Sequence, residues 1–347
     1  MSALTLVWLA ALVQVVGALT WMLWLIGLRV WRQRAEARLA SDHQAVLGVL
    51  VEILREVPNA PERLRPYLGR PRVLAEAVLE FLALIRGSGQ EVVLDELRLL
   101  GVHQVLRAGL SLRSKSGGLA IIDALAAFGG SEADQALNLA LKDRDPDVRI
   151  AALKGLAGCG AAISIRTVLA HAAKDARKPS RLLVEVVRSV ASAKPDEAIQ
   201  ALADGDLDPL CRTLLLDALG ASGAYEALPV LIASAADPDP ELRTAAVRGL
   251  GRMMHPAGEA AIGVALADGN WQVRAAGAES AGHAGLSRLA DGLGRLLDDP
   301  EWWVRFRAGE ALSRLGVSGL ERLRAAAVSD RPVAQLTATL ALAESGL

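Results

Sequence analysis

The chain has 347 residues, of which 52% are hydrophobic and 3% aromatic, so its core must be built mainly from Ala, Leu and Val. This composition favours closely packed helices, because sheets use more β-branched and aromatic residues. The 38 basic and 39 acidic residues exclude a global positive field that would attract nucleic acid, and two cysteines, Cys159 and Cys211, exclude a disulfide framework and a four-cysteine zinc site.

The first predicted element is a membrane span at residues 3–28, a stretch without any charged side chain. At about 1.5 Å per residue, the segment Leu4–Leu28 spans about 37 Å, which exceeds a bilayer core of about 30 Å. The alternative is a cleaved signal peptide. However, no Lys or Arg precedes the apolar run, and Trp21–Ile26 occupies the place where small residues would mark a cleavage site. We therefore expect a retained transmembrane helix.

Flanking charge predicts how this span is oriented in the lipid bilayer. Arg29, Arg32, Arg34 and Arg38 follow it, whereas only the chain's own amino group precedes it. Since Lys and Arg stay on the cytoplasmic side of a membrane, we expect a single-pass protein of the cell (inner) membrane. Its N-terminus would lie outside and its C-terminal part in the cytoplasm. The use of 32 arginines against 6 lysines is typical of a GC-rich bacterium.

The next two regions are predicted to be helical but irregular. Residues 29–57 are interpreted as a juxtamembrane helical stalk. In residues 58–130, apolar periodicity over 73–85, 92–100 and 119–128 predicts helices separated by glycine-containing turns. We interpret this second region as divergent helical repeats.

Residues 131–347 contain an internal repeat of 31 or 32 residues. Each unit has an aspartate followed six residues later by an arginine. The aspartates are Asp143, Asp175, Asp206, Asp237, Asp268 and Asp299, and the arginines are Arg149, Arg181, Arg212, Arg243, Arg274 and Arg305. So many matched positions at one spacing indicate a repeat architecture.

The residues around each aspartate predict what one unit looks like. Asp followed by Pro or Gly is typical of the end of one helix and the start of the next, because the carboxylate accepts backbone N–H groups there. Eight residues after each arginine the side chain is small, so that neighbouring helices can approach. Each unit is predicted to be two helices that cannot bury their apolar faces alone, and about seven units would stack as an all-α solenoid.

One unit carries a recognisable family pattern. The segment Arg243–Gly251, which reads Arg-Thr-Ala-Ala-Val-Arg-Gly-Leu-Gly, and the Asp-x-Asp-Pro-x-Val-Arg run before such segments resemble the HEAT family. The resemblance is to the short form named after phycobilisome lyases. It implies that the recurring aspartates and arginines form a structural ladder between adjacent repeats, and it predicts no activity.

Nothing in the sequence indicates catalysis. The five histidines are scattered without the spacing of a metal site, and both cysteines are interpreted as buried, inert thiols. The glycines at 155, 158 and 160 lack the preceding strand of a phosphate-binding loop. We expect no catalytic, cofactor-binding or metal-binding residue, no small-molecule substrate and no enzymatic activity.

Two units depart from the repeat pattern with large aromatic side chains. Three residues before the ladder arginine, where other units carry proline, these units carry Trp271 and Trp302, and Trp303 replaces a polar residue. Phe306 and Arg307 follow closely. Aromatic and Arg clusters are typical of binding hot spots, so these five residues are predicted to bind a partner. The alternative is that the rings fill a wide turn between repeats.

Three functions remain possible at this point. The first is a membrane-anchored scaffold that binds protein partners at the cytoplasmic face of a membrane, for example in a bacterial membrane enzyme system such as envelope-glycan synthesis. The second is a bilin-lyase-like subunit, which the family resemblance suggests but the predicted anchor disfavours. The third is nucleic-acid binding, which the absence of a basic track along the repeats disfavours.

Overall fold

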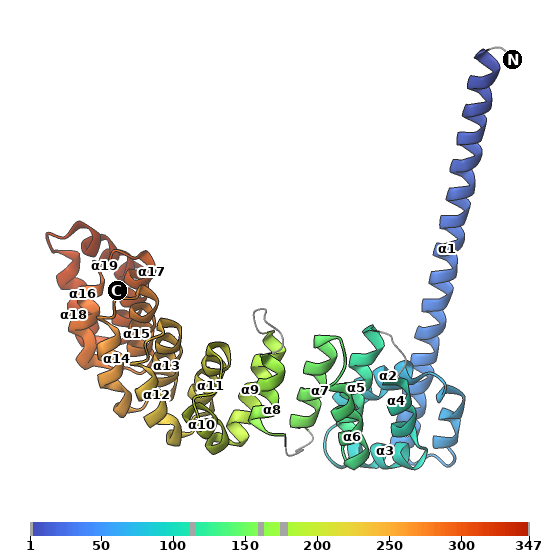
Figure 1. Ribbon diagram of the computed structural model, residues 1–347, viewed down its shortest axis with the longest axis horizontal. Coiled ribbons are helices and arrows are strands. Elements are labelled where there is room, and N and C mark those ends of the chain that lie inside the picture. The colour runs from blue at the N-terminus through green and yellow to red at the C-terminus, as the bar shows by residue number, and fades with distance from the viewer. Residues whose placement is uncertain (1–2, 111–114, 159–162, 174–179, 346–347) are drawn as a thin grey trace. The chain divides into compact units, whose positions relative to one another are not determined.

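The computed structural model describes residues 3–110, 115–158, 163–173 and 180–345. The described residues form α-helices and short 3-10 helices and no strand, which confirms the all-helical solenoid class (Figure 1). They divide into two compact units, Met1–Gly155 and Leu156–Leu347.

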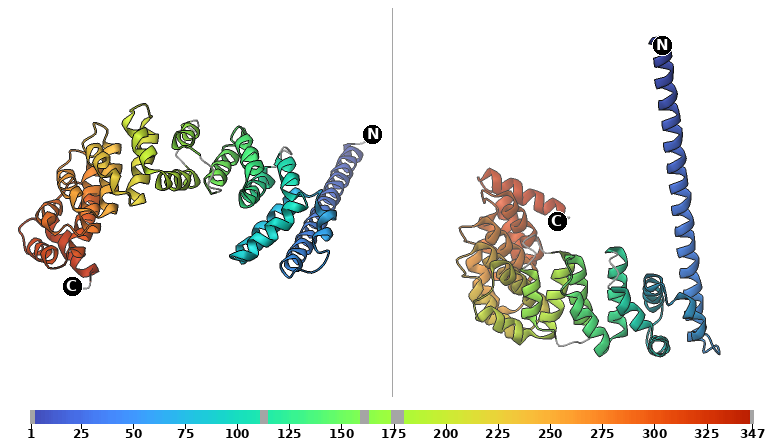
Figure 2. Two further views of the ribbon diagram at one scale, coloured as in Figure 1. Left: turned by 90° about the horizontal axis from the view of Figure 1, so that it is seen from below. Right: turned by 45° about the vertical axis from the view of Figure 1, so that its right-hand side comes forward.

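The first unit is a helical cluster into which only the end of its longest helix packs. That helix, α1 (Ala3–Leu54), buries Val46, Leu50 and Ile53 near its C-terminus, while its described side chains from 19 to 45 are exposed or half-buried. Figures 1 and 2 show the rest of α1 leaving the other helices of this unit. Those helices are η1 (Pro61–Tyr67), α2 (Pro71–Leu84), α3 (Ser88–Leu99), α4 (Val102–Leu110), α5 (Lys115–Phe128), α6 (Ser131–Ala140) and most of α7 (Pro146–Gly158).

The N-terminal part of the expected fold is not confirmed. We expected a transmembrane helix at 3–28 and a separate stalk at 29–57, but α1 is one uninterrupted helix, because no proline interrupts this stretch and arginine is a good helix former. Among the described residues, no helix combines the length and the apolar character needed to cross a membrane.

The first unit also extends beyond the expected start of the regular repeats at residue 131. Helix α6, which begins there, packs on α4 and α5 of the first unit. The division between the units therefore falls later, inside α7.

The second unit has two layers of helices. One layer is a row in which each helix packs on the next: α9 (Arg181–Ala193), α11 (Pro209–Ser222), α13 (Pro240–Met253), α15 (Trp271–His283), α17 (Trp302–Arg314) and α19 (Pro332–Glu344). The other layer is formed by α8 (Ile165–Ala172), α10 (Pro195–Ala203), α12 (Leu228–Ser234), α14 (Glu259–Ala265), α16 (Ala290–Leu296) and α18 (Gly316–Ala327), and most of its members are packed against the first (Figure 1). Short 3-10 turns, η2 (Tyr225–Ala227), η3 (Pro256–Gly258) and η4 (Ser287–Leu289), precede α12, α14 and α16. This is the stacking of helix pairs that the repeat predicts.

Small side chains allow the helices of the row to pack closely, as the sequence predicts. A Cβ atom added to Gly282 would lie 2.7 Å from the Cα atom of Ala311, and one added to Gly251 would lie 2.5 Å from the Cβ atom of Ser280. Such distances are too short for ordinary contact, so a larger side chain at either glycine would push two repeats apart.

Three helices of the row, α11, α13 and α15, are capped as expected, whereas Glu301 before α17 and Arg331 before α19 make no side-chain cap bond. Asp239 accepts a hydrogen bond from the backbone N–H of Glu241, and Asn270 accepts one from that of Gln272, each at 2.8 Å. Asp208 accepts one from the N–H of Cys211 at 3.0 Å. This bond is the main reason why the pKa of the Asp208 carboxyl is below its ordinary value. The caps position the ladder residues that stand beside them.

Candidate interaction surface

The aspartate–arginine ladder forms three consecutive contacts between repeats. Arg243 donates two hydrogen bonds to Asp268, both at 2.8 Å, and Arg274 donates two to Asp299, at 2.7 and 2.9 Å. Arg212 donates one to Asp237 at 2.6 Å. The two bidentate contacts have the parallel geometry that makes Arg–carboxylate pairs strong.

Two of these ladder arginines, Arg243 and Arg274, also hold the turns of their own repeats. Arg243 donates to the backbone oxygens of Asp237 and Pro238 at 2.9 and 3.0 Å, and Arg274 does the same one repeat later. Each aspartate in turn accepts the backbone N–H two residues further on, as Asp268 does from Asn270 at 2.8 Å. One arginine thus connects two turns, and these hydrogen bonds of its guanidinium group all go to partners within the chain.

The pKa values of the ladder carboxyls reflect this pairing. Burial alone would raise the pKa of Asp268, but hydrogen bonds from Arg243 and from the Asn270 N–H outweigh burial and lower it. The same balance, with Arg212 and the N–H of Asp239, lowers the pKa of Asp237. The carboxylates of Asp237 and Asp268 are therefore held charged for structural reasons, and the lowered pKa of each is the opposite of what a general acid needs.

The contacts that the structure describes at the other predicted ladder positions are different ones. Arg149 donates to the backbone oxygens of Asp143 and Arg144, both at 3.1 Å, and Arg305 makes the equivalent bonds to Asp299 and Pro300. The side chain of Arg181 is 95% exposed and lies 3.5 Å from Glu185 of its own helix. Asp206 instead pairs with Arg166 at 2.9 Å, and Asp175 lies outside the described residues.

The structure groups most of the predicted partner-binding residues at the start of α17. The aromatic cluster, which we define as Trp302, Trp303 and Phe306, has ring centroids 4.6 Å apart for the tryptophan pair and 5.3 Å apart for Trp302 and Phe306. Arg307 lies 5.9 Å from the centre of the Phe306 ring and donates to Glu310 at 2.8 Å. Helical spacing of four residues brings Phe306 under Trp302.

The aromatic cluster remains half open to solvent. Trp302 and Trp303 are 53% and 52% exposed, so neither is required to fill the interior of its own repeat. A contact between two aromatic rings contributes about 0.5–1.5 kcal/mol beyond the energy gained by burying their surface. The cluster is therefore a preformed apolar surface.

Trp271 does not join this cluster. It begins α15, one repeat earlier, and is 37% exposed. Among the ring contacts of the described residues, none connects Trp271 with Trp302, Trp303 or Phe306. The prediction that all three tryptophans share one ridge therefore gains no support from ring contacts.

A groove beside the aromatic cluster was missed at the sequence level. It lies between α17 and α19, has a volume of about 320 Å³, and is lined by Trp302 and Phe306 on one side and by Leu340 and Ala341 on the other. Leu336 and Leu340 of α19 are largely exposed. Their apolar spacing with Val333, at positions i, i+3 and i+7 of the last helix, was the sequence signal that could have indicated this surface.

The cysteine that the structure describes, Cys211, is buried. Burial, followed by the nearby Asp208 carboxylate, raises the pKa of the Cys211 thiol to about 12, so this cysteine is protonated and unreactive at neutral pH. Cys159 lies outside the described residues. In the part of the chain that the structure describes, no group of three or more His, Cys, Asp or Glu side chains could hold a metal ion.

Comparison with known proteins agrees with this architecture. The sequence profile of HEAT repeats matches residues 195–264 and 259–343. These two matches identify HEAT repeats within residues 195–343, which is less than half of the chain. These matches cover the part of the second unit in which the three ladder contacts and the aromatic cluster lie. No curated protein matches the chain.

Solved structures resemble the chain only as folds. Human deoxyhypusine hydroxylase is 16% identical with a TM-score of 0.32, over 88% of this chain and 98% of that one. The complex of CpcE and CpcF of phycocyanin lyase from Nostoc is 18% identical with a TM-score of 0.28, over 78% and 94%. An Escherichia coli protein, YibA, is 15% identical with a TM-score of 0.41, over 75% and 98%. Likenesses this distant do not indicate an activity for the HEAT repeats described here.

Proposed function

We propose that the chain is a non-enzymatic scaffold whose HEAT repeats bind a protein partner through the aromatic cluster and the groove between α17 and α19. The observation that carries the proposal is the exposure of Trp302 and Trp303 next to a groove of about 320 Å³. Partner-binding centres in proteins are enriched in Trp, Tyr and Arg and lie where apolar surface can be desolvated.

The charges around this surface favour a protein over other ligands. Arg305, Glu310 and Glu344 line the groove together, and Arg307 is already paired with Glu310 at 2.8 Å and with Glu279 at 3.7 Å. A nucleic acid needs an uncompensated basic surface, and a small substrate needs a more enclosed site with convergent polar groups. A mixed, half-open surface with aromatic anchors suits a protein.

Attachment to a membrane through residues 3–28 is the second part of the proposal. It is supported by the absence of charge in this segment and by side chains around α1, such as Trp21, Leu23 and Trp24, that are more than half exposed. A helix with apolar side chains on all faces needs a cover, and a bilayer provides one. With four arginines after the segment, the HEAT repeats would face the cytoplasm and organise a membrane enzyme system such as that of envelope-glycan synthesis.

The two parts have separate tests. For the first, full-length chain in mild detergent is cross-linked and recovered, and the proteins recovered with the wild type are compared with those recovered with a Trp302→Ala/Trp303→Ala variant. Val264→Ala, which truncates an exposed side chain on α14, is the matched control. We expect partner recovery to fall for the double variant alone; unchanged recovery with all three chains would contradict the proposed surface.

For the second part, a reporter that is active only in the periplasm is fused after Leu347. It should stay silent in whole cells while the fusion protein sediments with membranes. An active reporter would contradict the orientation, and a fusion protein recovered only in the supernatant would contradict the attachment.

A further inference from the structure

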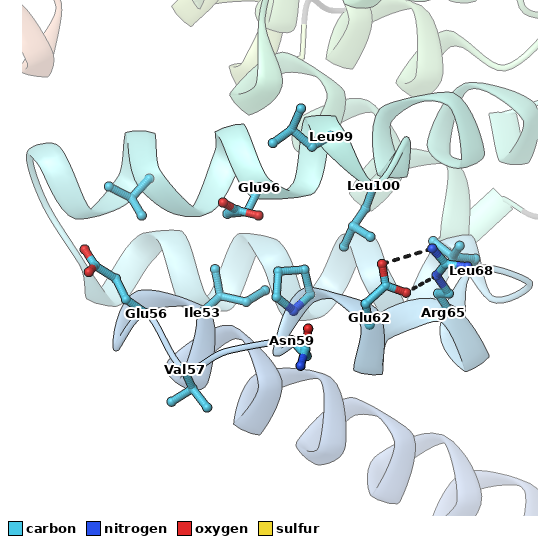
Figure 3. Close-up of a pocket in the computed structure, with 12 residues that line it drawn as sticks. Ile53, Glu56, Val57, Asn59, Glu62, Arg65, Leu68, Glu96, Leu99 and Leu100 are labelled. Carbon is cyan, nitrogen blue, oxygen red and sulfur yellow. Dashed lines mark hydrogen bonds and ion pairs between the residues drawn. The ribbon is translucent and has the colours of Figure 1, made fainter.

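A second groove lies in the first unit, far along the sequence from the aromatic cluster. It has a volume of about 690 Å³ and is formed by the end of α1, by η1 and by one face of α3 (Figure 3). None of the sequence motifs indicated this groove, because its lining residues come from three segments that only the folded chain brings together.

Part of the lining of this groove is apolar and accessible to solvent. Helix α3 directs Val93, Leu94 and Leu97 into the core, and its neighbouring face, with Leu99 82% exposed, lines the groove. Val57, just after α1, is also exposed and lines the opposite side. Exposed apolar side chains that line one groove form a surface that a partner can desolvate.

The charge of the groove is negative. Figure 3 shows Glu56, Glu62 and Glu96 spread along it, with Arg65 held by Glu62, to which it donates a hydrogen bond of 2.9 Å. Among the ion pairs of the described residues, none involves Glu56 or Glu96. Two neighbouring cations, Arg63 and Arg98, are bound by Glu52 and Asp95. The groove therefore offers two carboxylates with no compensating cation, and Glu96 is half-buried.

The negative charge of the groove indicates which class of molecule can bind in it. Phosphate groups of nucleic acids and of anionic lipids are repelled by carboxylates in a partly desolvated groove. A protein segment with Lys or Arg side chains beside apolar ones satisfies both features. The walls are helical and offer no strand edge for an added strand, so a helix is the form that fits, with apolar anchors at i, i+3 or i+4, and i+7.

We propose that this groove docks a basic amphipathic helix of a partner protein. The apolar face of that helix covers Val57 and Leu99, and its flanking Lys or Arg side chains pair with Glu56 and Glu96. Glu56 is held in place by a left-handed backbone conformation, with φ of 55°, at the point where the chain leaves α1. The inference is independent of the aromatic cluster, which belongs to the other unit.

The test uses random 16-residue peptides displayed on phage and selected on the full-length chain in detergent. Peptides that bind a Glu96→Lys/Leu99→Ser variant are removed first. We expect the remaining peptides to carry Lys or Arg beside apolar residues at helical spacing. Enrichment of acidic peptides, of peptides without that spacing, or of none that distinguishes the two chains would overturn the proposal.

A charge exchange then tests the assigned contact. For one enriched peptide, Glu96→Lys should weaken binding at least about tenfold, while Glu91→Lys, the same change on α3 outside the groove lining, should change it less than about twofold. Replacing the peptide's Lys or Arg by Glu should restore binding to Glu96→Lys. If no such exchange restores binding, the pairing is wrong. Glu56→Lys takes the place of Glu96→Lys if circular dichroism shows that the latter is unfolded.

Discussion

The aspartate–arginine ladder and the aromatic cluster lie in the same row of helices. They differ in how much of their side-chain surface and bonding capacity stays available to a partner. Arg243 and Arg274 use their guanidinium groups on partners within the chain. Trp302 and Trp303, at the N-terminal end of α17, each leave about half of their surface in solvent. The ladder contact recurs between four consecutive units and is explained by the fold, whereas the aromatic cluster of the described residues occurs in one unit and stays half exposed. In a repeat protein, the departure from the repeat is the better guide to function.

The largest effect should come from the core that supports both features. Leu312 of α17 is fully buried, and truncation of such a side chain costs about 2–5 kcal/mol. We expect Leu312→Ala to lower the free energy of unfolding by that amount, as measured by urea denaturation. A folded Leu312→Ala chain should still bind partners. A loss of binding in the folded state would show that core and cluster are not separable.

A smaller loss is expected from breaking one ladder contact. Arg243→Ala leaves the Asp268 carboxylate, whose side chain is only 14% exposed, without its charged partner. The expected cost is about 2 kcal/mol, between the values for surface pairs and for buried ones. Arg181→Ala is the matched control, because its exposed pair with Glu185 should contribute less than about 0.5 kcal/mol. Equal losses in the two variants would contradict a structural role for the ladder geometry.

The reverse pattern is expected for the aromatic cluster. Trp303→Ala should weaken binding of a protein recovered in the cross-linking experiment by about 1–2 kcal/mol, the lower end of hot-spot values. Its thermal unfolding should change less than that of Leu312→Ala. If Trp303→Ala unfolds as readily as Leu312→Ala while the folded remainder binds normally, the rings serve to fill the turn and the partner surface lies elsewhere.

The smallest effect should appear as a dependence of stability on pH. Burial opposes ionisation of Asp268, but Arg243 and the Asn270 N–H lower its pKa below the ordinary value. Stabilisation from a carboxyl with a lowered pKa is present above the unfolded value of about 3.9 and is lost as pH falls through the folded value. Urea midpoints measured from pH 6 to pH 3 should therefore decline less steeply for Arg243→Ala than for the wild type. Parallel curves would show that the pairing contributes nothing to the acid limb.

The sequence predicted the features that depend on local spacing. The helix caps at Asp239 and Asn270 and the close approach at Gly282 follow from residues within one unit or at one repeat distance. The contact of Arg243 with Asp268 was predicted from the family resemblance, and the repeat spacing indicates which residues form it. Such features need only the repeat to be recognised.

The sequence could not predict what depends on packing between distant segments. Arg181 and Asp206 keep the spacing of the ladder but do not pair with each other. Asp206 forms an ion pair with Arg166, and Arg181 lies beside Glu185. Both grooves arise where helices from different repeats or segments face each other. The membrane span was predicted from the length and the absence of charge of residues 3–28, and neither determines how a helix is covered. The role of the aromatic residues stays a prediction.

The ladder also determines how the chain can change in length. Asp237, Asp268 and Asp299 each accept a backbone N–H within their own turn and bind the arginine of the preceding unit, so each of these contacts is shared by two neighbouring units. A deletion of residues 238–268, one full repeat length, would keep the contacts of Arg212 with Asp237 and of Arg274 with Asp299. A deletion one residue shorter would leave an extra residue in that turn, so that an aspartate there could not keep the repeat spacing to both the arginine before it and the arginine after it. Gain or loss of whole units is thus the natural route by which such a solenoid lengthens or shortens while its aromatic end is preserved.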